Sequence, residues 1–243
     1  MLLNGKIFHI DYGGNVMNMN KFLELMSDKG ISIITDYVLL FSKKSSFTVT
    51  PSNESCVEFN DPVNYCIQIN TTELTKECEY VFLHEFFHCV QYEEGFPRIK
   101  PMSNEYKEFA TEFGSSVLDF NIRTRLESYG YFNHIEQLND GYQTLIDIYN
   151  ILFKLKENED ISYFENIQRA TLLVTLYQGK IHNNDISKLL RLIRTVNPQT
   201  YEIYKLINKC FKMYNYDSKS GVYKIFKKLI SELKLEKYLS MTN

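Results

Sequence analysis

The segment Tyr80–Tyr92 constrains this chain more than any other, because it places ionisable groups inside an apolar helix. Its residues are apolar on nearly every face, which is typical of a helix that is buried all round. Within it, the run His84-Glu85-Phe86-Phe87-His88 adds two imidazoles and one carboxylate. Such groups are costly to bury without partners. The segment therefore predicts a buried helix whose polar groups are engaged by a shared ligand.

The spacing of the two histidines indicates a metal ion as that ligand. Residues four apart lie on the same face of a helix, so His84 and His88 can reach one ion. H-E-x-x-H is the pattern in which two histidines hold zinc. We expect His84 and His88 to bind Zn²⁺, and we expect Glu85 to act as the general base on a zinc-bound water without being a ligand.

A third protein ligand is expected from the helix that follows, which begins near Ser103. Catalytic zinc sites typically use three protein ligands and leave one position open. Glu105, Glu108 and Glu112 recur at intervals of three and four, so they share one helix face. A solvated helix face would show the same pattern, because charged side chains are mostly exposed.

The run Glu108-Phe109-Ala110-Thr111-Glu112 begins twenty positions after His88. In this it resembles the gluzincin metallopeptidases of the thermolysin-like branch. The resemblance covers Glu79 to Glu112. It implies that Glu108 is the third zinc ligand. It also implies that Glu112 is the acid that orients a zinc-bound histidine, and we expect that histidine to be His84. A second register resembles the Glu-Ala-x-x-Phe-Ala element of peptidases that cleave phage repressors. It makes Glu105 the ligand, although Tyr106 stands where those peptidases have a small residue.

The predicted elements change in kind along the chain. Strand-like segments precede the motif, and they are Lys6–Tyr12, Ile31–Phe41, Phe47–Thr50, Cys56–Phe59 and Tyr65–Ile69. From Asn104 onward amphipathic helices dominate, with the clearest stripe at Val222, Ile225, Phe226, Leu229, Ile230 and Leu233.

These elements predict an α+β protein in two lobes. A zincin-like lobe over residues 1–103 combines a small mixed sheet with the motif helix. A mainly helical lobe over residues 104–243 carries the third ligand, and the zinc lies at the floor of a cleft between the lobes. In zinc peptidases the strand before the motif helix pairs with extended substrate, a mode that needs an exposed sheet edge. The sequence leaves open which strand lies at an edge.

Composition and charge bear on location and partners. The N-terminus lacks a basic region followed by an apolar run, and no segment approaches eighteen apolar residues, so we expect a cytoplasmic protein without signal peptide or membrane span. Delivery into another cell as an effector stays open. Five cysteines without compact spacing indicate reduced thiols. The net charge of −3 divides into +8 for residues 180–243 and −11 for the rest. These basic residues alternate with apolar ones as solvated helix faces do, so nucleic acid is not an expected partner.

The constellation predicts a zinc metallopeptidase that hydrolyses peptide bonds of a protein or peptide substrate, and we expect it to act as an endopeptidase. A second donor besides zinc must stabilise the oxyanion. We select His134 for that role from a set that also contains Tyr129, Tyr131 and Tyr142. Two alternatives stay open: a catalytically inactive, zinc-binding peptidase-like module in regulation or interaction, and a helical interaction protein with an accidental motif. The sequence specifies neither the substrate nor the oligomeric state.

Overall fold

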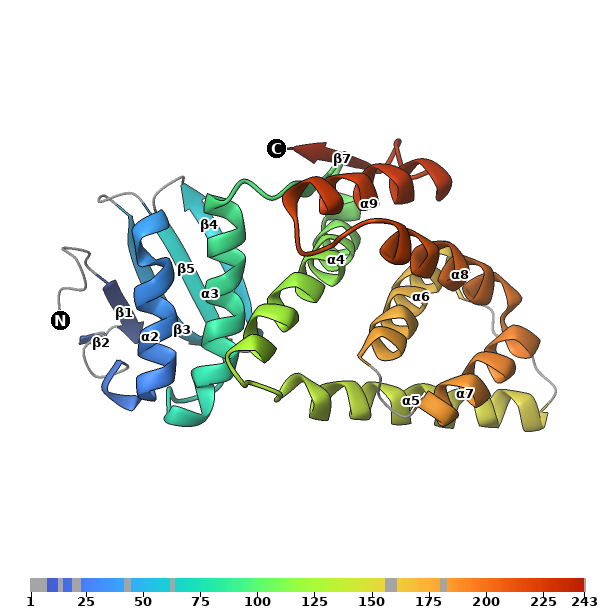
Figure 1. Cartoon of the computed structure of the whole chain (residues 1–243), viewed down its shortest axis with the longest axis horizontal. Helices are drawn as coiled ribbons and strands as arrows, with labels where there is room; N and C mark the ends of the chain where they lie inside the picture. The colour runs from blue at the N-terminus through green and yellow to red at the C-terminus, as the bar shows by residue number, and fades with distance from the viewer. Residues whose placement is uncertain are drawn as a thin grey trace. The chain divides into compact units, whose positions relative to one another are not determined.

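The chain divides into two compact units (Figure 1). The computed structural model describes residues 8–12, 15–18, 23–41, 45–61, 64–155, 161–179 and 183–242. The first unit comprises Met1–Phe96 and Arg125–Tyr131, and the helical unit comprises Pro97–Thr124 and Phe132–Asn243. Sheet and helices in the first unit and mainly helices in the second agree with the predicted α+β class. The main division falls after Phe96 rather than after residue 103, and one short later segment belongs to the first unit.

A five-stranded mixed sheet forms the base of the first unit, with the strand order β2-β1-β3-β5-β4. β3 lies parallel to β1 and β5, whereas β2 and β4 are antiparallel to their neighbours. Along β5, Tyr65, Ile67 and Ile69 are buried and alternate with half-exposed residues, as the two-residue period of a strand requires. The strands are β1 (Phe8–Tyr12), β2 (Asn15–Asn18), β3 (Ser46–Ser52), β4 (Cys56–Asp61) and β5 (Asn64–Asn70).

The prediction of a small mixed sheet is thus confirmed, and so are three of its strands, which correspond to β3, β4 and β5. The strand predicted over Lys6–Tyr12 is observed from Phe8 onward, and its first two residues lie outside the described part of the chain.

The prediction of a strand over Ile31–Phe41 is wrong, because this segment is helical. It forms most of α2 (Asp28–Tyr37) and the 3-10 turn η1 (Val38–Leu40). The hydroxyl of Ser27 caps α2 by accepting a hydrogen bond from the backbone N–H of Gly30. Strand propensity is a weak and context-dependent preference, and here the cap and the burial of Ile33 and Ile34 outweigh it.

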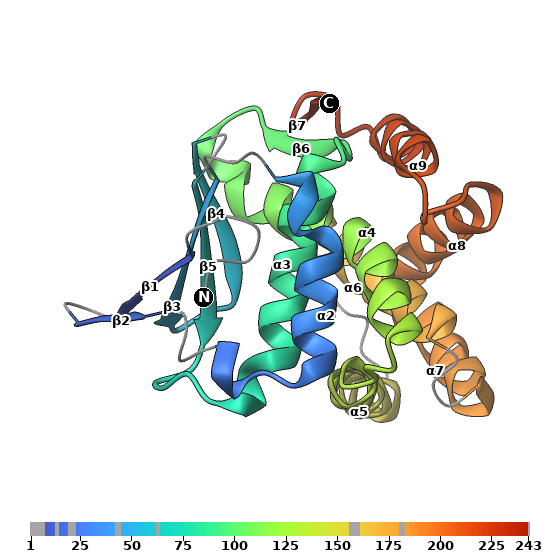
Figure 2. The same cartoon turned by 60° about the vertical axis from the view of Figure 1, so that its left-hand side comes forward.

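Helix α3 (Glu79–Glu93) carries the H-E-x-x-H run and packs beside α2 on one face of the sheet (Figure 2). On its sheet side, the rings of Phe82 and Phe86 join an aromatic cluster with Phe41, Phe47 and Tyr65. On its α2 side, Phe87 meets Tyr37 edge to face, with 5.1 Å between ring centroids. Each fully buried ring of this kind stabilises the fold by about 1.5–3 kcal/mol relative to exposure. The apolar residues of the motif helix thus fix its position in the first unit.

The helical unit has its own aromatic core along α4 (Lys107–Ser128). Phe109, Phe113 and Phe120 of α4 pack against Phe164, Phe226 and Phe211, which come from three other helices. The stripe predicted from Val222 to Leu233 is buried, as expected. The remaining elements of the unit are β6 (Arg98–Pro101), η3 (Asn104–Tyr106), α5 (His134–Leu155), α6 (Tyr163–Gln178), α7 (Asn183–Val196), α8 (Pro198–Met213), α9 (Lys219–Glu232) and β7 (Leu239–Thr242).

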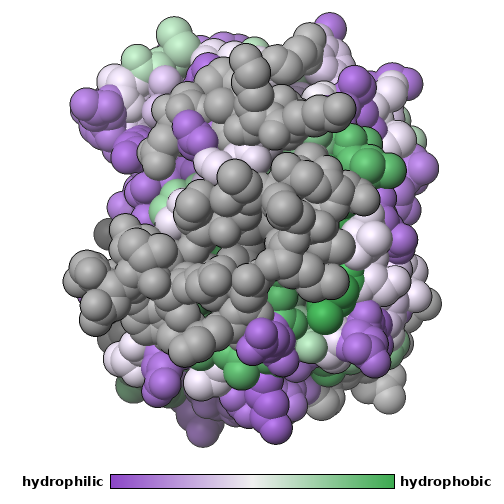
Figure 3. All heavy atoms as spheres, turned by 90° about the vertical axis from the view of Figure 1, so that its left-hand side faces the viewer, coloured by the Kyte–Doolittle hydropathy of each residue, from purple (hydrophilic) through white to green (hydrophobic). Residues whose placement is uncertain are grey.

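The described surface mixes polar and apolar side chains, as Figure 3 shows for one face of the molecule. Leu39 and Leu40, for example, are 74% and 45% exposed. Folded proteins commonly expose scattered apolar residues, so these leucines do not by themselves mark a site. Among the residues described, none of the helices combines the length and apolar character needed to cross a membrane.

Candidate metal centre

His84 and His88 occupy the partly open face of α3. The residues from Phe82 to Val90 are buried except for these two histidines, which are half-exposed. Their ring centroids lie 5.2 Å apart and the ring planes make an angle of 76°. The two imidazoles therefore share one helix face, as their spacing predicts, and their nitrogen atoms can converge on one ion.

Glu85 lies on an adjacent, more buried face of α3 and is only 6% exposed. Helix α3 packs against both β4 and β5. The thiol of Cys56 on β4 has its pKa raised to about 11, first by burial and then by the carboxylates of Glu54 and Glu85. The carboxylate of Glu85 is therefore near enough to β4 to act electrostatically on the thiol of Cys56.

β4, rather than β5, forms the edge of the sheet on this side. The segment Tyr65–Ile69 belongs to β5, which has β3 on one side and β4 on the other. Its backbone groups are therefore used within the sheet. β4 is the terminal strand in the order of the described strands. An extended peptide could add to its outer backbone groups, the mode known as β-augmentation.

Asp119 of α4 is the carboxylate that groups with the two histidines. One ligand atom from each of His84, His88 and Asp119 lies within 4.8 Å of the others, and each of the three side chains is half-exposed. Two ligands that hold one zinc ion at roughly 2.0–2.2 Å are at most about 4.4 Å apart, so small side-chain rotations would suffice. Three protein ligands with an open position are the usual composition of a catalytic zinc site. The residues present therefore fit a divalent metal ion.

The third member of this group is not the residue expected from the sequence. Glu108 lies in the first turn of α4 and is exposed, as is Glu105 in the preceding 3-10 turn. Asp119 follows Glu108 by eleven positions, close to three helical turns, so the two residues share a helix face but lie about 16 Å apart along the axis. Asp119 thus lies on the predicted helix and on the predicted face, but about three turns after Glu108.

Farther along α4, Arg125 contacts the end of α3. This residue and the last turn of α4 belong to the first unit. Its guanidinium binds Glu94, at the end of α3, through two hydrogen bonds of 3.1 and 2.7 Å. It also lies 5.8 Å from the ring centroid of Phe87, the neighbour of His88. Because Glu108 precedes Arg125 by seventeen positions, it is about 25 Å farther along the helix axis.

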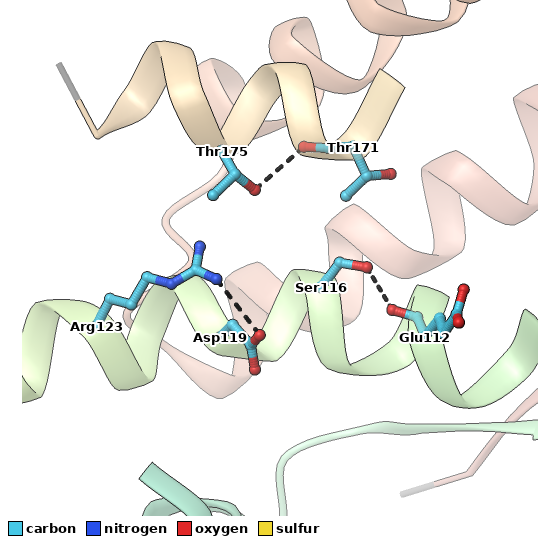
Figure 4. Close-up of polar contacts among 6 residues, drawn as sticks. All are labelled: Glu112, Ser116, Asp119, Arg123, Thr171 and Thr175. Carbon is cyan, nitrogen blue, oxygen red and sulfur yellow. Dashed lines mark hydrogen bonds and ion pairs between the residues drawn. The ribbon is translucent and has the colours of Figure 1, made fainter. Parts of the chain in front are cut away.

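Asp119 has a charged neighbour one turn farther along α4. Nη2 of Arg123 lies 3.6 Å from Oδ2 of Asp119, and the two side chains are 21% and 17% exposed. Figure 4 shows both residues on one face of α4, with Thr171 and Thr175 on the neighbouring helix α6. This ion pair offsets part of the cost of holding a carboxylate in a half-buried position.

Glu112 and His134, the other two predicted site residues, lie outside the metal group. The carboxylate of Glu112 accepts a hydrogen bond from the amide of Gln168 on α6, and its backbone carbonyl accepts one from Ser116. His134 is the first residue of α5 and is only 3% exposed. The proposed roles of Glu112 and His134 stay predictions.

Two of the tyrosines considered as oxyanion donors serve a different purpose. Tyr131 donates a hydrogen bond to Glu79, in the first turn of α3, and Tyr129 donates one of 3.3 Å to Asp36 of α2. Burial, followed by the hydrogen bond to Glu79, raises the pKa of Tyr131 to about 12. These contacts hold the segment after α4 on the first unit.

The sequence does not predict Asp119, because its distance of 31 positions from His88 matches neither the position of Glu108 nor that of Glu105. One sequence feature does point to it. Asp119 stands between Leu118 and Phe120, in a run that is otherwise mostly apolar, and an acid in such a run needs a partner. The whole chain matches no known family model, and no curated protein or solved structure matches it either. The site has therefore to be judged from its own chemistry.

Proposed function

We propose that this protein is a metal-dependent peptidase that hydrolyses peptide bonds of a protein or peptide substrate. The observation that carries the proposal is the group formed by His84, His88 and Asp119, with the carboxylate of Glu85 next to the first histidine in the chain. A divalent ion in such a group acidifies water and polarises a carbonyl group. Zinc is the metal proposed, since the histidines of H-E-x-x-H motifs most often bind zinc.

Proton transfer and substrate binding are assigned to other residues of the chain. Glu85 would take the proton that the attacking water loses and pass it to the leaving nitrogen, the ordinary task of a general acid–base group. Its burial shields that proton transfer from bulk solvent. The outer backbone of β4 would hold an extended substrate, because β4 is the terminal strand beside α3.

The chemistry of the group supports this proposal better than the resemblance to gluzincins does. In that resemblance the third ligand is a glutamate, whereas the group contains Asp119. Two histidines and one carboxylate are also a donor set used for iron(II) in oxygenases. The metal must therefore be identified directly.

Metal analysis of the purified protein is the first experiment. We expect one zinc ion per chain after purification without added metal, and we expect zinc to bind more tightly than iron(II) or manganese(II) in competition. A protein that binds none of these ions would refute the proposal. Stoichiometric zinc without cleavage of any member of a broad peptide library would instead favour an inactive, zinc-binding module.

Substitution of the general base separates metal binding from chemistry. Glu85→Gln keeps the shape of the side chain but removes the group that accepts the proton. We expect kcat to fall by at least about 10²-fold, the lower range for a general base, with the zinc content unchanged. Glu93→Gln, in the same helix, serves as the control. Full activity in Glu85→Gln would exclude the role that we assign to this residue.

A further inference from the structure

One guanidinium donor of Arg123 lacks a hydrogen-bond partner among the described residues. Its Nη1 atom is buried and has no hydrogen-bond partner within the described part of the chain, whereas Nη2 lies 3.6 Å from Asp119. Buried donors in folded proteins nearly always have a partner. A guanidinium cannot escape this requirement by losing its proton. An unused donor one turn from a candidate metal ligand therefore points to a ligand that binds there.

We infer that Arg123 is an anion-binding residue of the site, and that it recognises an oxygen anion of the substrate held next to Asp119. The inference rests on the proposed function, because it takes Asp119 to be a metal ligand. When Asp119 shares its negative charge with a metal ion, the guanidinium of Arg123 is only partly neutralised. The surroundings then carry excess positive charge, which favours an anion over a neutral group.

The shape of the guanidinium suits this task. Arginine presents its donors in a planar fork that matches the two oxygens of a carboxylate and the geometry of other oxygen anions. One arm of the fork faces Asp119, and Figure 4 shows the guanidinium extending from α4 toward the α6 side. The ring of Phe120 lies 6.0 Å from the guanidinium carbon and limits its freedom. Arg123 is thus positioned before the anion binds.

The oxygen anion has two possible sources in peptide hydrolysis. It is either the negative charge that develops on the carbonyl oxygen during attack or the free carboxylate at the C-terminus of a peptide. In the first case Arg123 is the oxyanion donor, the role that the sequence predicts for His134. In the second case it sets specificity for peptide ends. The chemistry that Arg123 recognises is the same in both.

Anion binding can be measured without any turnover. The protein is loaded with cobalt(II), and its visible absorption spectrum is followed while acetate is added. We expect Arg123→Met to keep cobalt(II) but to bind acetate at least tenfold more weakly than the unsubstituted protein. Arg194→Met is the matched control, because it removes a guanidinium that stacks on Tyr201 in another part of the helical unit.

Each result of this titration decides one question. Unchanged acetate affinity in Arg123→Met would overturn the inference and leave the proposed function intact. Loss of cobalt(II) from both Arg123→Met and Arg123→Lys would show that Arg123 only supports Asp119, and would also overturn it. If the unsubstituted protein bound no metal, the proposed function itself would fail.

Kinetics with paired peptides identify the source of the anion. One peptide of the pair ends in a free carboxylate and the other in an amide. A fall in kcat of about 10²-fold or more for both peptides in Arg123→Met indicates the developing oxyanion, the cost usual for one lost donor. A rise in KM confined to the free acid indicates the terminal carboxylate. Equal kinetics in variant and unsubstituted protein would contradict both.

Discussion

Asp119 and Glu108 lie on the same face of α4, but their surroundings differ. Glu108 is exposed in the first turn, where charged side chains are ordinarily solvated. Asp119 is half-buried, pairs with Arg123 and groups with two histidines. A carboxylate in that position has lost part of its hydration, so a cationic partner stabilises it more than it would stabilise a solvated carboxylate.

Asp119→Asn should therefore abolish most metal binding, whereas Glu108→Gln should not. We expect Asp119→Asn to weaken zinc affinity by at least about a hundredfold, since the loss of an outer-shell partner alone costs about 10–100-fold. Glu108→Gln and Glu105→Gln should bind zinc as the unsubstituted protein does. Calorimetric titration measures all three. Loss of zinc from Glu108→Gln alone would restore the ligand implied by the resemblance to gluzincins.

At the scale of elements, α4 connects two environments. Its first five turns pack in the aromatic core of the helical unit, whereas its last turn belongs to the first unit. That last turn is fastened to α3 by the ion pair between Arg125 and Glu94. A helix transmits position along its axis because its hydrogen bonds make it stiff. The attachment at Arg125 should therefore affect the position of Asp119, six residues earlier.

Removal of this attachment should weaken the proposed metal site, although Arg125 is not one of its ligands. We expect Arg125→Met to lower zinc affinity by about tenfold, the lower bound for residues that orient a ligand from outside. Arg194→Met again provides the control, because its guanidinium also lies 5.8 Å from an aromatic ring. Calorimetry would detect the difference. Equal zinc affinity in both variants would show that Asp119 does not depend on Arg125.

At the scale of the whole molecule, the chain passes between its two units at three points. Its path leaves the first unit after Phe96, returns at Arg125 and leaves again after Tyr131. The returning segment is held on the first unit at several points. Besides the bonds of Tyr129 and Tyr131, the ammonium of Lys29 lies 4.5 Å from the ring centroid of Tyr131. Unfolding of either unit should therefore disturb this segment.

The alkaline stability of the molecule should depend on Tyr131. Its pKa is raised from the ordinary value of 10.0 to about 12, so the folded chain keeps this proton to a higher pH than the unfolded chain. The stabilisation is complete below about pH 10 and is lost as the pH rises through about 12. In Tyr131→Phe, the fall in the free energy of unfolding between pH 10 and 12 should be shallower. Urea unfolding measures it, with the exposed Tyr223→Phe as the control. Identical pH profiles in the two variants would exclude this role.

Much of the first unit could be predicted from local patterns. The helix over Glu79–Glu93 follows from a long apolar segment. The strands β3, β4 and β5 follow from short apolar or alternating segments. The segment Ile31–Phe41 could not be predicted in this way. Its β-branched residues suit a strand, but Ser27 caps a helix there and the buried positions recur at three and four.

The sequence alone determined which residues of α3 can serve a metal, because helical geometry places residues i and i+4 on one face in any fold. It also determined that Glu85 is buried beside them, since the surrounding residues are apolar. Only the tertiary structure decided the third member of the group. That member is Asp119, which lies eleven positions after Glu108 on the same helix face, and no local pattern distinguishes the two acids. Local periodicity identifies a face of a helix, whereas packing selects the turn along it.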